Sequence, residues 1–233
     1  MGADIVGISS MATRQILAEL GGSYQRQTGR SVAIESVGGV DAARRIRAGE
    51  SFDIVVLADD AMKQLEADGC IEPASRAGFA ESAIAVAVRA GANPPALADE
   101  AGTKAAILAA RSICYSTGPS GTHLIRLLER WGIDRQMADR IVKAPPGVPV
   151  GTLVARGEAE LGFQQLSEFL DVPGIEVAGP LPPEIQSVTL FSCGVGARAS
   201  NPAGARELIL YLTSAEADDA KRRHGMEPPP ARS

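Results

Sequence analysis

The chain has 233 residues, of which 45% are apolar and 4% aromatic, and a net charge of −5. This length can bury one large core or two smaller ones. Its basic residues are scattered and its aromatic residues few, which argues against nucleic acid as a partner. No apolar run approaches the ~18 residues that a membrane span requires. The three cysteines lie far apart without C-x-x-C spacing, so they predict buried thiols rather than a disulfide framework.

The first part of the chain alternates between apolar strands and amphipathic helices. We expect strands over 5–8, 31–37 and 53–58. Helices are expected from Ile16 to Tyr24, over 40–48 and over 60–67, the last capped by Asp59 or Asp60. The βαβαβα order predicts a mainly parallel sheet.

The rest of the chain continues the alternation after a boundary near residues 79–82. Strands are expected over 82–88, 112–115, 161–163, 174–178 and 187–193, and helices over 97–110, 124–131, 202–212 and 215–223. We therefore expect two α/β lobes. The first comprises residues 1–80 plus 189–233, and the second comprises residues 81–188.

Two stretches, one in each half, follow the same plan. Gly38-Gly39-Val40 leads into AARRIRAGE and the strand DIVVLA, and Gly147-Val148-Pro149 leads into TLVARGE and the strand LGF. Each helix start leaves backbone N–H groups unpaired and electropositive. The repeated plan predicts that an anion is held between the two lobes.

The turns from strand to helix consist of small or hydroxyl-bearing residues. Such turns offer N–H and O–H donors to an oxyanion or carboxylate, although serine and glycine are also ordinary caps and turn formers. The predicted ligand-binding residues are those of the turns together with a glutamine pair after LGF: Ser9, Ser10, Gly38, Gly39, Ser116, Thr117, Ser120, Gly121, Thr122, Gly147, Val148, Gln164 and Gln165.

Common nucleotide and metal motifs are missing from the sequence. Neither G-x-x-x-x-G-K-[ST] nor G-x-G-x-x-G after the first strand occurs, so nucleotides are disfavoured. The only histidines, His123 and His224, lie about a hundred positions apart without a cluster of acids or cysteines. We expect no metal and no cofactor.

Few residues qualify as catalytic groups. His123 lies in the first turns of a helix and Glu168 follows the glutamine pair by three residues, so each is a candidate base. Both are equally compatible with ordinary structural roles. Arg14, in the first helix, could reach a carboxylate.

The chain resembles the molybdate-binding-protein-like family of type 2 periplasmic solute-binding proteins of ABC transporters. The resemblance covers nearly the whole length, through Ser10 after the first strand, Ala48 to Ile54 (AGESFDI), the PSG turn at Ser120, VARGEAELG at 154–162, and Tyr211-Leu212. It implies an α/β, two-lobed periplasmic-binding-protein type 2 fold with mixed, mostly parallel sheets, a hinge and a central cleft.

The resemblance also implies site residues and two departures from the family pattern. Ser10 matches the family's first serine, and Ser120 and about Gly147 match its amide donors. Gly38 or Gly39 replaces the second serine, and Gln165 stands where the family has a tyrosine. A buried tetrahedral dianion must be matched donor by donor, so these changes favour an organic (poly)carboxylate over molybdate.

The family fold includes aconitate isomerase-like enzymes, which leaves a second function open. A cofactor-independent 1,3-proton shift on an unsaturated polycarboxylate would need carboxylate clamps and one base, either His123 or Glu168. Other implied partners are a small anionic ligand and an ABC transporter membrane component, with the chain a monomer. The expected location is periplasmic if a leader has been removed, and cytoplasmic if Met1 is the native start.

Overall fold

The computed structural model describes residues 3–230, and the chain divides into two compact units. Unit 1 is Met1–Ser82 with Thr189–Ser233, and unit 2 is Ala83–Val188. The chain passes from one unit to the other twice, within strand β4 (Ala77–Arg89) and at the start of strand β9 (Val188–Val195). Met1 and Gly2, on which the expected location depends, lie outside the described residues.

Unit 1 is a mixed sheet in which β1 pairs in parallel with both β2 and β3, and β3 pairs antiparallel with β9. Its strand order is β2-β1-β3-β9. Besides parts of β4 and β9, its elements are β1 (Ile5–Ser10), η1 (Met11–Thr13), α1 (Arg14–Thr28), β2 (Val32–Val37), α2 (Gly39–Arg47), β3 (Ile54–Ala58), α3 (Asp59–Ala67), α8 (Pro202–Leu212), η5 (Ala215–Ala217) and α9 (Asp218–Arg223).

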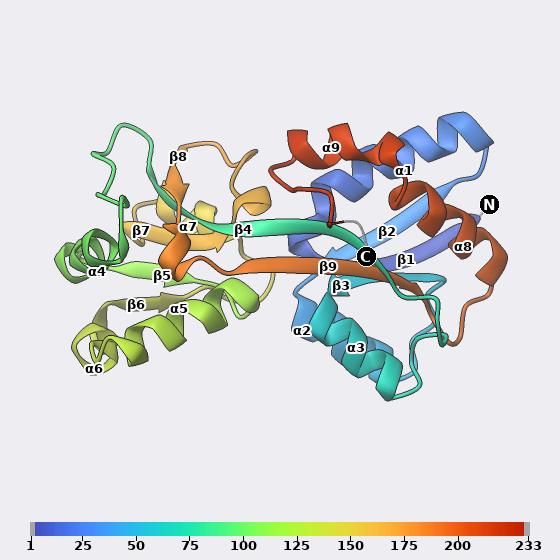
Figure 1. The fold of residues 1–233 in the computed structure, drawn as a ribbon, viewed down its shortest axis with the longest axis horizontal. Coiled ribbons are helices and arrows are strands. Elements are labelled where there is room, and N and C mark those ends of the chain that lie inside the picture. The colour runs from blue at the N-terminus through green and yellow to red at the C-terminus, as the bar shows by residue number, and fades with distance from the viewer. Residues whose placement is uncertain (1–2, 231–233) are drawn as a thin grey trace. The chain divides into compact units, whose positions relative to one another are not determined.

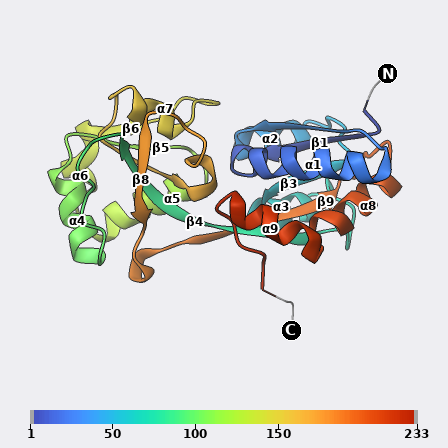
Figure 2. The same cartoon turned by 90° about the horizontal axis from the view of Figure 1, so that it is seen from above.

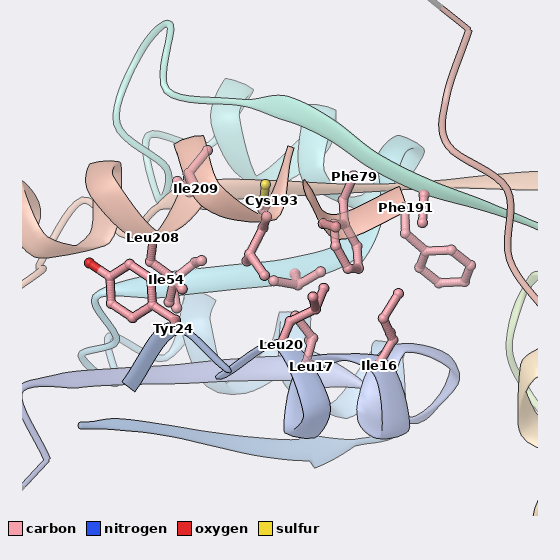
Figure 3. Close-up of a cluster of buried hydrophobic side chains, with 14 of the residues drawn as sticks. Ile16, Leu17, Leu20, Tyr24, Ile54, Phe79, Phe191, Cys193, Leu208 and Ile209 are labelled. Atoms are coloured by element: carbon pink, nitrogen blue, oxygen red, sulfur yellow. The ribbon is translucent and has the colours of Figure 1, made fainter. Parts of the chain in front are cut away.

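Helices cover both faces of this sheet, with α2 and α3 on one face and α1 and α8 on the other (Figure 1). On the α1 side, apolar side chains of α1 and α8 point toward the strands (Figure 3). The labelled members of this core are Ile16, Leu17, Leu20, Tyr24, Ile54, Phe79, Phe191, Cys193, Leu208 and Ile209. Buried strands with helices on both faces explain the near-continuous apolar runs in the sequence.

The start of α3 differs from the prediction. Asp59 is the first residue of the helix rather than its cap, and Ala58 in the cap position offers no side-chain acceptor. The buried Asp59 carboxylate instead accepts hydrogen bonds from Ser192 at 2.6 Å and Arg76 at 2.6 Å, and it pairs with Lys63. Burial would raise the pKa of Asp59, but the bonds from Lys63 and Ser192 and the charge of Arg76 together lower it.

Unit 2 is a second mixed sheet with strand order β4-β7-β5-β6, in which β8 also pairs with β4. β5 runs parallel to β6 and β7, whereas β4 runs antiparallel to β7 and β8. Besides part of β4, its elements are α4 (Glu100–Ala109), β5 (Ile113–Tyr115), α5 (Pro119–Arg130), α6 (Asp134–Met137), η2 (Ala138–Arg140), β6 (Ile141–Lys143), α7 (Val150–Ala155), β7 (Leu161–Gln165), η3 (Leu166–Glu168), β8 (Ile175–Pro180) and η4 (Pro183–Ile185). Figure 2 labels its helices α4, α5, α6 and α7 and its strands β4, β5, β6 and β8.

Helices α4, α5 and α6 pack on one side of this sheet, and α7 packs on the other. Helix α4 begins at Glu100, three residues later than predicted, because the Asp99 carboxylate accepts a hydrogen bond from the Gly102 N–H at 2.7 Å. That bond satisfies one of the donors left open at a helix start. The α/β class with mixed sheets is as predicted.

The three thiols differ in burial. Cys114 and Cys193 are buried in strands, whereas Cys70 is half-buried and lines a small groove in unit 1, so the prediction of burial was wrong for Cys70. Burial raises the pKa of Cys114 to about 11 and that of Cys193 to about 12. Thiolates are the reactive form, so both buried thiols are protected.

We therefore expect Ellman's reagent at pH 8 to modify Cys70 in the native protein and to leave Cys114 and Cys193 unmodified until denaturant is added. Absorbance at the thionitrobenzoate band, before and after addition of guanidinium chloride, measures this difference. Rapid reaction of more than one thiol in the native protein, seen as release of more than one equivalent of thionitrobenzoate, would contradict the burial described above.

Within residues 3–230, no helix is long and apolar enough to cross a membrane.

Candidate functional site

In unit 1, the candidate site begins where β1 ends. Ser10 is the last residue of β1 and the cap residue of η1, and the residue is only 7% exposed. Its hydroxyl forms no hydrogen bond with any described residue. An unsatisfied buried hydroxyl is costly, so such a group in a stable protein calls for an explanation. A bound ligand whose oxygen accepts a hydrogen bond from Ser10 is one such explanation.

Ser9, the neighbouring residue, is used differently. Its buried hydroxyl lies 2.8 Å from the Ser36 hydroxyl on β2 and also donates to the Ser10 carbonyl at 3.3 Å. The register of β1 and β2 pairs Ser9 directly with Ser36. Ser9 therefore joins the ends of two strands. Sequence reasoning did not single out Ser36, because its role depends on this register.

The start of α2 lies beside Ser10. Gly38 is the cap residue of α2 and offers no side-chain acceptor, so the first N–H groups of the helix have no cap. A Cβ built on Gly39 would meet only the Ser10 Cβ, at 3.8 Å, and one on Gly38 would meet nothing within 4 Å. Neither glycine has a positive φ. Packing and backbone geometry therefore do not require glycine here, and Gly39 lies against the Ser10 side chain.

In unit 2, the loop after β5 and the start of α5 form a tighter structure. Ser120 is buried at the second position of α5, after Pro119, and Gly118 caps the helix without a side chain. A Cβ on Gly121 would lie 1.8 Å from the Ser116 carbonyl oxygen. Gly121 is thus needed for packing, whatever its role toward a ligand.

The other residues of this loop are more accessible. Ser116 is half-buried, and Thr117 and Thr122 are exposed. The Thr122 hydroxyl and N–H both donate to the Gly118 carbonyl, at 3.3 and 3.1 Å, so Thr122 reinforces the first turn of α5.

The turn before α7 uses two of its N–H groups within unit 2. Gly147 has φ +77°, and the Val148 N–H donates to the Pro145 carbonyl at 3.0 Å, which closes a tight turn. The first N–H of α7, on Val150, donates to the Gln164 side chain at 3.2 Å. These two N–H groups are satisfied within unit 2 and are not open donors, because a turn and a distant glutamine supply their acceptors.

Both the oxygen and the nitrogen of the Gln164 side-chain amide form hydrogen bonds. Besides accepting from Val150, it donates from Nε2 to the Glu168 carboxylate at 2.7 Å. Gln165, the next residue of β7, is also buried and pairs in register with Ile84 of β4. The two glutamines of the pair thus have distinct surroundings, and Gln164 connects β7, α7 and η3.

The two candidate bases have different partners. His123 is half-buried in α5, and its Nε2 lies 2.7 Å from the Ile185 carbonyl oxygen. Because a carbonyl can only accept, Nε2 carries the proton, which leaves Nδ1 as the basic nitrogen. Glu168 ends η3 and accepts the bond from Gln164. Next to Glu168 in η3, the buried Ser167 hydroxyl is a further small donor that the sequence pattern did not single out.

Across residues 3–230, no three His, Cys, Asp or Glu side chains are grouped in a way that could hold a metal ion.

The family model of bacterial extracellular solute-binding proteins matches residues 5–227. The chain belongs to this family. It is also 36% identical over 230 residues to a curated aconitate isomerase of a Pseudomonas species, a match that covers 96% of this chain and 87% of the isomerase.

Solved structures agree with this family assignment at the level of the fold. The periplasmic molybdate-binding protein of Azotobacter vinelandii superposes with a TM-score of 0.80 at 21% identity, covering 97% of this chain and all of that one. AgtB of A. tumefaciens R10, solved with agropinic acid, gives 0.72 at 16% identity, covering 98% of this chain and 83% of that one. The resemblance to molybdate-binding-like type 2 proteins is therefore confirmed.

Proposed function

We propose that this solute-binding protein binds a small organic polycarboxylate in preference to molybdate. The observation that carries the proposal is the Ser10 hydroxyl, buried without a partner beside the uncapped, side-chain-free start of α2. A hydroxyl and free N–H groups at a helix start suit a carboxylate oxygen. Ser120, Thr122, Gly147 and Gln165 of unit 2 remain predicted ligand residues.

The choice of a carboxylate over molybdate rests on the donors that this chain lacks. A glycine stands where the resemblance implies a second serine, and the space around Gly38 and Gly39 is open. A compact tetrahedral dianion would leave that space empty and its own oxygens short of donors, which is costly in a buried site. A larger anion with separated carboxylates fills the space.

Family membership implies a small ligand and, in general, an ABC transporter as partner. We extend the proposal to a monomer that delivers its ligand to a transporter membrane component. Size-exclusion chromatography with light scattering tests the monomer directly, since a dimer would double the mass of 24.2 kDa.

The curated isomerase relative favours a second candidate function, isomerisation of aconitate. In this reaction a base removes a proton from the methylene carbon, the double bond moves by one position, and the proton returns to the former alkene carbon. No oxidant or reductant is needed. Glu168, or His123 through Nδ1, would serve as the base.

One experiment separates the two functions. Thermal shifts are measured with molybdate, sulfate, malate, citrate, cis-aconitate and trans-aconitate, and each aconitate is then incubated in D2O and followed by proton NMR. Binding alone predicts a raised melting temperature with a carboxylate and an unchanged spectrum. Isomerisation predicts the other isomer and deuterium at the exchanging carbon. Shifts with molybdate but with no carboxylate would overturn the proposal.

A further inference from the structure

Among the described residues of unit 1, the cationic side chains are paired, with one exception. In its described part, each lysine and arginine other than Arg14 has an ion pair or a hydrogen bond from its charged group to an acid, a hydroxyl or a backbone carbonyl; Arg26, for example, donates to Ser23 at 2.8 Å. The Arg14 guanidinium has no such partner among residues 3–230 and is exposed.

The position of Arg14 makes an unpaired charge unfavourable. It is the first residue of α1, and no acid lies in the first turn of that helix. A cation there is repelled by the positive end of the helix dipole. The Arg14 guanidinium is therefore free to pair with an anion outside the chain.

Arg14 follows Ser10 by four residues, directly after the single turn of η1 that Ser10 caps. It lines a groove of about 500 Å³ together with Ser36 of β2. The carboxylate in that groove, Glu35, is already held by both Nη atoms of Arg45 at 2.9 Å. Glu35 therefore does not neutralise Arg14.

We propose that Arg14 is the charge-recognition residue of unit 1, which binds one carboxylate of a polycarboxylate whose other oxygens meet Ser10 and the start of α2. This inference rests on the proposed function and adds to it the requirement for at least two carboxylates. Arginine can hold a carboxylate through two parallel hydrogen bonds.

The test compares Arg14→Gln, Arg14→Lys and the matched control Arg26→Gln, which removes the same charge from the other end of α1. Isothermal titration with cis-aconitate at low and high salt measures affinity, and thermal melting without ligand measures stability. We expect Arg14→Gln to weaken binding about ten- to a hundredfold and to flatten its salt dependence. Arg14→Lys should restore part of the affinity, and Arg26→Gln should bind like the parent.

Melting distinguishes ligand recognition from a structural role. Because Arg14 opposes its helix dipole, the free Arg14→Gln protein is expected to melt at the same temperature or slightly higher, whereas a structural residue would lower it. Parent-like binding of cis-aconitate by Arg14→Gln would overturn this inference alone. Failure of the parent protein to bind any carboxylate would overturn both this inference and the proposed function.

Discussion

Replacing Ser10 by alanine is expected to weaken binding of cis-aconitate about ten- to a hundredfold while leaving the free protein as stable as before or more so. The lost contact is a hydrogen bond to a charged oxygen, worth about 1.5–3 kcal/mol. The removed hydroxyl is buried without a partner, so its loss spares the free protein a desolvation cost. Isothermal titration and urea unfolding measure the two effects.

Ser9→Ala is the matched control, because it makes the same change at the adjacent residue. The Ser9 hydroxyl is satisfied by Ser36, so its removal leaves a hydroxyl on β2 without its partner. We expect a loss of about 1 kcal/mol in the free energy of unfolding and a smaller effect on binding. If Ser10→Ala destabilised the protein and bound cis-aconitate normally, Ser10 would be a structural residue.

Replacing Gly121 by alanine is expected to lower the free energy of unfolding by about 3 kcal/mol or more. The new Cβ would lie 1.8 Å from the Ser116 carbonyl oxygen and 2.5 Å from the Tyr115 ring. The Ser116 oxygen belongs to the backbone, so either α5 or the preceding loop would have to move and lose contacts. Urea unfolding measures the loss, and thermal melting should show a decrease of about 6–12 °C.

Gly22→Ala provides the contrast, since it is the same change inside a helix with room for the methyl group. The nearest atom to a Cβ on Gly22 is the end of the flexible Arg26 side chain, at 3.5 Å. Alanine is the better helix former, so we expect a gain of about 0.5–1 kcal/mol. Comparable stability of Gly121→Ala and the parent protein would contradict the close packing of α5 on its loop.

Local sequence patterns predicted the strands and helices well, because each depends on residues a few positions apart. The period-3.6 pattern from Ile16 to Tyr24 marks the buried face of α1, and the apolar run DIVVLA marks β3. Errors arose at the ends of elements, and the short elements α6 and β6 were not predicted. The roles of Asp59 and Asp99 depend on where their carboxylates find donors, and for Asp59 those donors are Ser192 and Arg76.

In the candidate site, too, local patterns predicted some features and distant contacts decided others. From sequence, the small residues at strand ends predicted turns with donors, and Ser10 and Gly39 do lie side by side in unit 1. Sequence could not show that the Val150 N–H is satisfied by Gln164, or that Val148 donates within its own turn. The Gln164 acceptor is placed by the packing of β7 and α7, which no local pattern encodes.

By itself, then, the sequence determined the alternation of strands and helices, the small residues at the helix starts and the family to which the chain belongs. Only the tertiary structure decided which donors are already used. Ser9 and Ser10 are adjacent and chemically identical, yet one hydroxyl is satisfied across the β1–β2 pairing and the other is not. The reason is that a hydrogen bond needs a partner at short range, and that partner comes from a residue distant in the sequence.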